Sequence, residues 1–140
     1  MKNLRCYAKI SMSNMLHNFE CIRELLPDGC EIIPVIKADA YCHGAIEFAR
    51  ALRGHVSTFA VAEMGEALTL RENGIKNDIL VLGYTDPAFA TVLADNEITQ
   101  TVMSLEYAKA LSDTISNLAS AKSCERSEYM KMVKKEKSAL

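Results

Sequence analysis

The feature that most constrains the fold of this chain is a regular alternation of short apolar runs with longer segments of helical periodicity. Strands are predicted at 6–10, 31–36, 58–62, 78–83 and 98–102, and helices at 13–27, 45–54, 63–74, 87–96 and 105–116. This order is typical of βα units around a parallel sheet, whose crossovers are right-handed. The predicted fold class is therefore α/β.

Two of these segments carry specific signals. The helix at 13–27 should begin with Ser13 as its N-cap and stop at Pro27. Its apolar stripe consists of Met15, Leu16, Phe19, Ile22, Leu25 and Leu26. The strand at 31–36 is almost continuously apolar, which indicates burial on both faces, although Pro34 lacks an N–H and weakens the ladder there.

Two architectures accept this pattern, an open doubly wound sheet and a (β/α) barrel, and periodicity alone does not separate them. A chain of 140 residues, 49% hydrophobic, has material for one core. It contains neither the G-x-G-x-x-G of dinucleotide-binding folds nor a G-x-x-x-x-G-K-[ST] phosphate loop. The common nucleotide-binding functions are therefore not indicated.

Charge and cysteine content exclude further classes. A net charge of −2 gives no basic excess for a nucleic acid or an anionic membrane surface, and no segment has the length of a signal peptide core or a membrane helix. We expect a cytoplasmic protein that binds no nucleic acid. An odd number of cysteines without C-x-x-C spacing suggests reduced, mostly packed thiols and no metal site, and they are Cys6, Cys21, Cys30, Cys42 and Cys124.

Lys37 is the first candidate functional residue because it directly follows the predicted strand at 31–36. In a barrel, functional side chains lie where strands end at the carboxyl face. A partly buried lysine at such a point can act as a catalytic amine and form a Schiff base. The alternative is a strand-end lysine whose stem packs while its ammonium group reaches water. Lys37 alone does not decide between them.

The residues around Lys37 favour the catalytic interpretation. The stretch VIKADAYCHGA, residues 35–45, resembles the lysine motif of bacterial alanine racemases, usually written V-V-K-A-N-A-Y-G-H-G. The resemblance extends over roughly residues 4–116 and includes YAKISMSNMLHN, FAVAEMGEALTLRENGI and ILVLGYTDP. GYTDP and ITQTV are also similar to the serine/alanine racemases of the vancomycin-resistance type, a related branch.

The resemblance implies the amino-terminal part of a (β/α)₈ barrel, incomplete here, that uses pyridoxal 5'-phosphate held covalently by Lys37. It implies an isomerase that interconverts L- and D-alanine for peptidoglycan precursors, and a homodimer for the full-length family. Alternatives are a serine racemase of the vancomycin-resistance type, a cofactor-binding protein without racemase activity, and a non-catalytic remnant that binds little or no cofactor. The predicted small-molecule partner is alanine or, in the first alternative, serine.

Three further positions match or depart from the family motifs. Tyr41 matches the tyrosine that helps to hold the cofactor phosphate, and its alternative is an aromatic residue packed over the strand end. Leu82 matches an apolar position against the cofactor, although as a lone leucine it also fits a core position. His43 fits a structural hydrogen bond better than a catalytic base. Cys42 replaces the usual glycine, at a cost of roughly 1–2 kcal/mol if the backbone there has positive φ.

The resemblance stops near residue 117. We predict a partial racemase barrel domain at 1–117 and a divergent basic tail at 118–140. The family's remaining barrel strands, its cofactor-site arginine and its second domain have no counterpart in this sequence. A truncated or frame-shifted racemase gene is our hypothesis. We expect little racemase activity from these 140 residues alone, and self-association through uncovered sheet edges.

Overall fold

The computed structural model describes residues 7–118, and the basic tail predicted at 118–140 lies almost wholly outside them. The secondary structure comprises six helical segments labelled α1 to α6, one 3₁₀ helix and three strands in the described part of the chain. In order they are α1 (Met12–Glu24), α2 (Lys37–Cys42), α3 (Ala45–Leu52), β1 (Thr58–Val61), α4 (Met64–Glu72), β2 (Asp78–Val81), η1 (Pro87–Phe89), α5 (Ala90–Asp95), β3 (Ile98–Gln100) and α6 (Leu105–Leu118).

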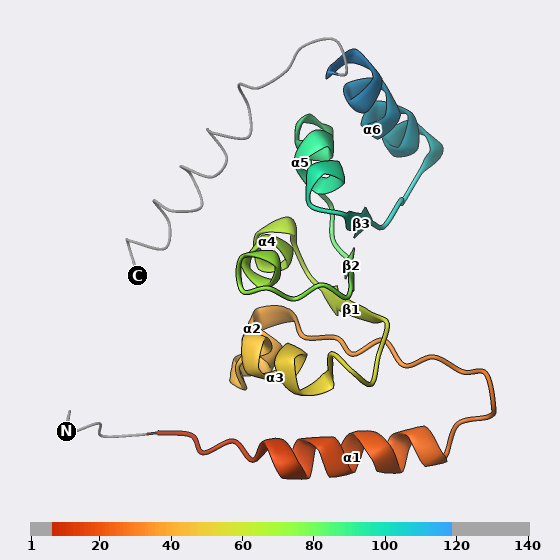
Figure 1. The fold of residues 1–140 in the computed structure, drawn as a ribbon. Coiled ribbons are helices and arrows are strands. Elements are labelled where there is room, and N and C mark those ends of the chain that lie inside the picture. The colour runs from red at the N-terminus through yellow and green to blue at the C-terminus, as the bar shows by residue number, and fades with distance from the viewer. Residues whose placement is uncertain (1–6, 119–140) are drawn as a thin grey trace.

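The three strands form a parallel sheet in the order β1-β2-β3, which confirms the predicted α/β class. Ala60 lies opposite Leu80, and Leu80 lies opposite Thr99. In Figure 1 the strands follow one another along one side of the molecule, with α2, α3, α4 and α5 beside them. All strands therefore end at the same edge of the sheet, which we call the carboxyl edge.

The core lies between this sheet and its helices. Phe59, Val61, Ile79 and Val81 alternate along β1 and β2 and are fully buried, because side chains two residues apart in a strand share a face. They join one apolar cluster with residues of α3, α4 and α5. On the opposite face, in the row of Ala60 and Leu80, Thr99 is exposed. Among the described residues, the helices thus cover one face of the sheet.

Two predicted strands are not strands. Residues 7–10 have no regular structure, and residues 31–36 keep a single parallel bridge between Val35 and Ala60. Around it, Ile36 N donates to Ala60 O at 2.8 Å and Ala60 N donates to Pro34 O at 2.9 Å. Pro34 has no N–H to extend the ladder, and Val35 is 41% exposed. The expectation of burial on both faces was therefore wrong.

The first helix exists but differs from its prediction at both ends. Its N-cap is Ser11, whose Oγ accepts from Asn14 N at 3.3 Å, and it ends at Glu24, before Pro27. Ser13 is therefore not the cap. Only the first half of the predicted stripe is covered, with Phe19 buried and Leu25 84% exposed. The reason is that α1 packs mainly against α3.

Helix α6 is joined to the end of β2 by its first turn. Ser104 Oγ accepts from Tyr107 N at 3.1 Å and caps the helix. Tyr107 Oη donates to Thr85 O at 2.7 Å, and its ring lies 5.1 Å from that of Tyr84. The pKa of Glu106 is lowered by hydrogen bonds from its own backbone N–H and from Ser104. This turn therefore fixes the chain that follows β2.

The cysteine environments differ from the prediction, and one histidine contacts a carboxylate. Cys21, Cys30 and Cys42 are free thiols, and all three are exposed rather than packed. His17 is exposed. The Nδ1 atom of His55 lies 3.2 Å from Glu20 Oε1. Helix α1 brings that carboxylate to the turn after α3, a contact between segments distant in sequence.

None of the helices among residues 7–118 combines the length and the apolar character that crossing a membrane requires.

Candidate functional site

Element α2, which begins at Lys37, is a left-handed helical turn rather than a right-handed α-helix. Ala38, Asp39, Ala40 and Tyr41 have φ between 50° and 54° and ψ between 46° and 50°, and Cys42 continues with φ 65°. A left-handed helix costs L-residues about 1–2 kcal/mol each, so five in succession store about 5–10 kcal/mol. Backbone strain of this kind persists where the surroundings enforce it, and it concentrates at functional sites.

The carboxylate of Glu66, in the first turn of α4, anchors the beginning of this turn. Its Oε1 accepts from Ala38 N at 2.6 Å, and its Oε2 accepts from Ala62 N at 2.7 Å. Ala62 directly follows β1. Hydrogen bonds to a charged acceptor are roughly twice as strong as neutral ones. Glu66 therefore joins the residue after Lys37 to the carboxyl end of the neighbouring strand.

The end of the turn is fixed by local hydrogen bonds. Asp39 O accepts from Gly44 N at 2.9 Å, and Asp39 Oδ1 accepts from Ala45 N at 2.7 Å at the start of α3. Gly44 has φ 91°, which glycine tolerates. His43 Nδ1 donates to Ala40 O at 2.9 Å. That contact agrees with the structural role predicted for His43.

Lys37 itself is half-buried at the carboxyl edge of the sheet. The residue before it, Ile36, is 2% exposed and bonded through its N–H to Ala60. The residue after it, Ala38, is bonded through its N–H to Glu66. The peptide groups on both sides of Lys37 are therefore fixed, while its side chain is partly open to solvent.

The two other predicted site residues are Leu82 and Tyr41. Leu82 follows β2, donates from its N–H to Val61 O at 2.9 Å and is 38% exposed. Tyr41 lies within the left-handed turn and is 56% exposed. After Leu82, a Cβ on Gly83 would lie 2.5 Å from Ala62 O, so this close approach requires glycine. Lys37 thus follows the segment bridged to β1, Leu82 follows β2 on the other side of β1, and Tyr41 lies four residues after Lys37 in the turn.

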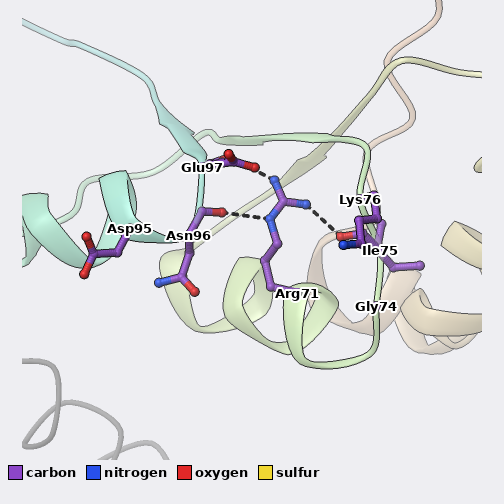
Figure 2. Close-up of a pocket in the computed structure, with 7 residues that line it drawn as sticks. All are labelled: Arg71, Gly74, Ile75, Lys76, Asp95, Asn96 and Glu97. Atoms are coloured by element: carbon purple, nitrogen blue, oxygen red, sulfur yellow. Dashed lines mark hydrogen bonds between the residues drawn. The ribbon is translucent and has the colours of Figure 1, made fainter.

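Two cavities lie at the other edge of the sheet, where the strands begin. One, of about 210 Å³, is drawn in Figure 2 with Arg71 at its centre. Arg71 Nε donates to Asn96 O, Nη2 to Glu97 O, and Nη1 to both Ile75 O and Asn77 O, at 2.7–2.8 Å. The guanidinium is thus occupied by main-chain carbonyls of the loops before β2 and β3.

The electrostatics of Arg71 agree with a structural role. Burial lowers the pKa of its guanidinium, while the carboxylates of Glu97 and Asp78 raise it. An arginine remains protonated in proteins, so the fork stays charged and donates throughout the neutral range. This end of a parallel α/β sheet is commonly the stabilising end, whereas chemistry occurs at the carboxyl end.

The second cavity, of about 140 Å³, lies beside α1 and is lined in part by Phe19, Arg23 and His55. Among residues 7–118, no group of three or more His, Cys, Asp or Glu side chains is arranged to hold a metal ion. Neither cavity is lined by Lys37, Tyr41 or Leu82.

The residues that shape the site, Glu66 and Asp39, are not among those predicted from the sequence. The sequence indicates only a helix at Glu66, whose partners Ala38 and Ala62 are 28 and 4 residues away. A carboxylate in the first turn of a helix that follows a short strand can indicate such an anchor, since this position lies close to free N–H groups. Asp39 is six residues before the helix start it caps, too far for the usual capping patterns.

Comparison with known proteins gives a consistent result. The family model for "Alanine racemase, N-terminal domain" matches residues 10–124. An alanine racemase of Desulfovibrio desulfuricans is 44% identical over 113 residues, which are 80% of this chain and 30% of that protein. The chain thus spans about a third of the length of the curated relatives it matches.

Solved structures give the same picture. An alanine racemase of Clostridium difficile 630 superposes with a TM-score of 0.78 at 39% identity, covering 85% of this chain and 32% of that one. A histidine racemase of Leuconostoc mesenteroides superposes with a TM-score of 0.70 at 36% identity, covering 75% and 28%.

Proposed function

Because the chain belongs to the alanine racemase N-terminal domain family, we propose that it supplies the lysine-bearing part of the active site of a pyridoxal 5'-phosphate-dependent amino-acid racemase. The observation that carries this proposal is the position of Lys37, half-buried at the carboxyl edge and followed by an anchored left-handed turn. Backbone strain of this size persists where the surrounding structure holds a side chain in one place.

The residues at this edge fit the cofactor. Lys37 offers an amine for its aldehyde. Tyr41 offers an exposed hydroxyl that can donate to a phosphate oxygen, and Leu82 offers an exposed apolar side chain against which a pyridine ring can pack. When bound, the cofactor withdraws electrons from the substrate α-carbon and makes its proton removable.

The roles of the chain's own residues follow. Lys37 would hold the cofactor and would accept or return a proton on one face of the substrate α-carbon. Tyr41 would bind the cofactor phosphate, and Leu82 would pack against the cofactor ring. Racemisation also needs an acid or base on the opposite face, and we assign none of the described residues to it.

The proposed substrate is alanine. This choice rests on the names of the relatives, because the Desulfovibrio desulfuricans protein and the Clostridium difficile structure compared above are both alanine racemases. Serine remains the alternative from the vancomycin-resistance branch. The histidine racemase shows that this part of the fold also occurs in an enzyme named for another amino acid. Substrate choice is therefore tested separately from cofactor attachment.

Cofactor attachment is tested by reduction and mapping. The chain is incubated with pyridoxal 5'-phosphate, reduced with borohydride, digested and analysed by mass spectrometry. We expect the adduct on Lys37, with Lys37→Ala as the control that abolishes it. The exposed Lys76, at the opposite edge of the sheet, is the internal reference. An adduct on Lys76 equal to that on Lys37 would refute the assignment.

Activity is tested in a chimaera. Residues 10–116 of this chain replace the corresponding part of the Clostridium difficile alanine racemase, which supplies the rest of the enzyme. We expect D-alanine formation that is lost in the Lys37→Ala chimaera, and faster turnover of alanine than of serine. A folded chimaera that binds the cofactor but racemises neither amino acid would contradict the proposed function.

A further inference from the structure

We infer that Glu66 is a positioning residue for Lys37: its carboxylate holds the left-handed turn that aims the lysine side chain. The inference rests on the proposed role of Lys37 and extends it to a residue on another element. Glu66 is on α4 and binds two main-chain N–H groups, one directly after Lys37 and one directly after β1.

Hydrogen bonds fix the backbone on both sides of Lys37. On one side, Ile36 N donates to Ala60 O at 2.8 Å, and on the other, Ala38 N donates to Glu66 Oε1 at 2.6 Å. The second oxygen of Glu66 accepts from Ala62 N, two residues beyond Ala60. The backbone on both sides of Lys37 is therefore tied to the same strand, directly through Ala60 and indirectly through Glu66.

The turn needs such an anchor because its conformation is unfavourable for the residues in it. Ala38, Tyr41 and Cys42 have φ of 50°, 54° and 65°, although none of them is glycine or asparagine. Without the bond to Ala38 N, these residues would lower their free energy by returning to right-handed or extended conformations. The direction in which the chain leaves Lys37 would then change, and with it the place of the amine.

The site requires a carboxylate rather than an amide. Both oxygens of Glu66 accept from N–H groups, at 2.6 and 2.7 Å. A glutamine offers one oxygen acceptor and one NH₂ donor, so one of the two N–H groups would face a donor. The substitution Glu66→Gln changes no volume and removes the charge, which makes it the appropriate perturbation.

The control is Glu63→Gln. Glu63 is an exposed carboxylate at the N-cap of the same helix, and its side chain makes no capping hydrogen bond. The two variants change the net charge equally and lie three residues apart. A general effect of charge near α4 therefore appears in both, whereas loss of the anchor appears only in Glu66→Gln.

The first measurement is the rate at which pyridoxal 5'-phosphate and borohydride modify Lys37, divided by the rate at Lys76 in the same molecule. We expect this ratio to fall about tenfold in Glu66→Gln, equivalent to about 1.4 kcal/mol, and to be unchanged in Glu63→Gln. A purely structural role would change the modification of both lysines together. An unchanged ratio in Glu66→Gln would overturn the inference.

The second measurement needs no cofactor. Amide hydrogen exchange should accelerate at Ala38 and Ala62 in Glu66→Gln, by about tenfold relative to Glu63→Gln, because both N–H groups lose a charged acceptor. If wild-type Lys37 is modified no faster than Lys76, the proposed function fails. Exchange at Ala38 still decides whether Glu66 holds the turn, so the two failures are distinguishable.

A double variant separates position from stability. Adding Cys42→Gly to Glu66→Gln should leave the Lys37 to Lys76 ratio low, because glycine at position 42 does not replace the anchor at Ala38 N. This result would support the inference even if Glu66→Gln alone folds poorly. A double variant that regains both the midpoint and the ratio would show that Glu66 acts through stability alone, which would overturn the positioning role.

Discussion

Replacing Cys42 with glycine should stabilise the protein, although it removes a side chain. Cys42 is the last residue of the left-handed turn, with φ 65°, and its side chain is exposed. A non-glycine residue here is costly only if φ is positive, and the structure meets that condition. The thiol makes little packing contact that the substitution would lose.

The magnitude follows from two opposing effects. Removing Cβ relieves about 1–2 kcal/mol of left-handed strain. Glycine also adds freedom to the unfolded chain, which costs about 0.5–1 kcal/mol. The net stabilisation is therefore about 0.5–1 kcal/mol. With a urea m-value of about 1.5 kcal/mol/M, the unfolding midpoint should rise by about 0.3–0.7 M.

The assay is urea unfolding of the chain, followed by far-UV circular dichroism. Cys42→Ala is the matched control, because it removes the thiol but keeps Cβ and so keeps the strain. It should leave the midpoint nearly unchanged. Cys30→Gly tests glycine at a free, exposed cysteine outside the positive-φ residues and should lower the midpoint. Equal midpoints for Cys42→Gly and Cys42→Ala would refute the strain argument.

Two further predictions concern regions away from Lys37. Arg71→Lys should lower the free energy of unfolding by about 2–4 kcal/mol, because an ammonium group cannot reproduce four directed hydrogen bonds. Arg50 is exposed, so Arg50→Lys should be nearly neutral in the same urea assay. Ser104→Ala should cost about 1 kcal/mol through loss of the α6 cap. The lowered pKa of Glu106 means that its stabilising contribution is present above its ordinary value of 4.5 and is lost as the pH falls through the lowered value. An NMR titration should show this carboxyl moving toward its ordinary pKa in Ser104→Ala, and an unchanged pKa would contradict the hydrogen bond from Ser104.

Local patterns predicted much of the fold because most elements carry their own signals. Helices α3 and α4 and strands β1 and β2 lie inside the predicted ranges 45–54, 63–74, 58–62 and 78–83. Apolar periodicity and the glycines that end helices are local properties, so they can be read from sequence. The strand at 31–36 failed for a different reason, since pairing depends on a neighbour and Pro34 limits that pairing.

The left-handed turn was not predictable from its residues. Alanine and tyrosine do not favour positive φ, and only Gly44 and the departure at Cys42 indicated unusual backbone. The turn exists because α4 supplies Glu66, a contact set by tertiary packing rather than by local preference. The cofactor roles of Lys37, Tyr41 and Leu82, and the domain boundary at residue 117, remain predictions.

The bond between Ala38 and Glu66 joins residues that are 28 positions apart, and this separation has a consequence during synthesis. Ribosomes add about 5–20 residues per second, so Lys37 is made roughly 1.5–6 s before its anchor. Until α4 emerges, Glu66 cannot bind Ala38 N, so the residues after Lys37 should sample right-handed and extended conformations. The nascent chain therefore carries a reactive amine before it has a site, and docking of α4 determines when that amine takes up its final place.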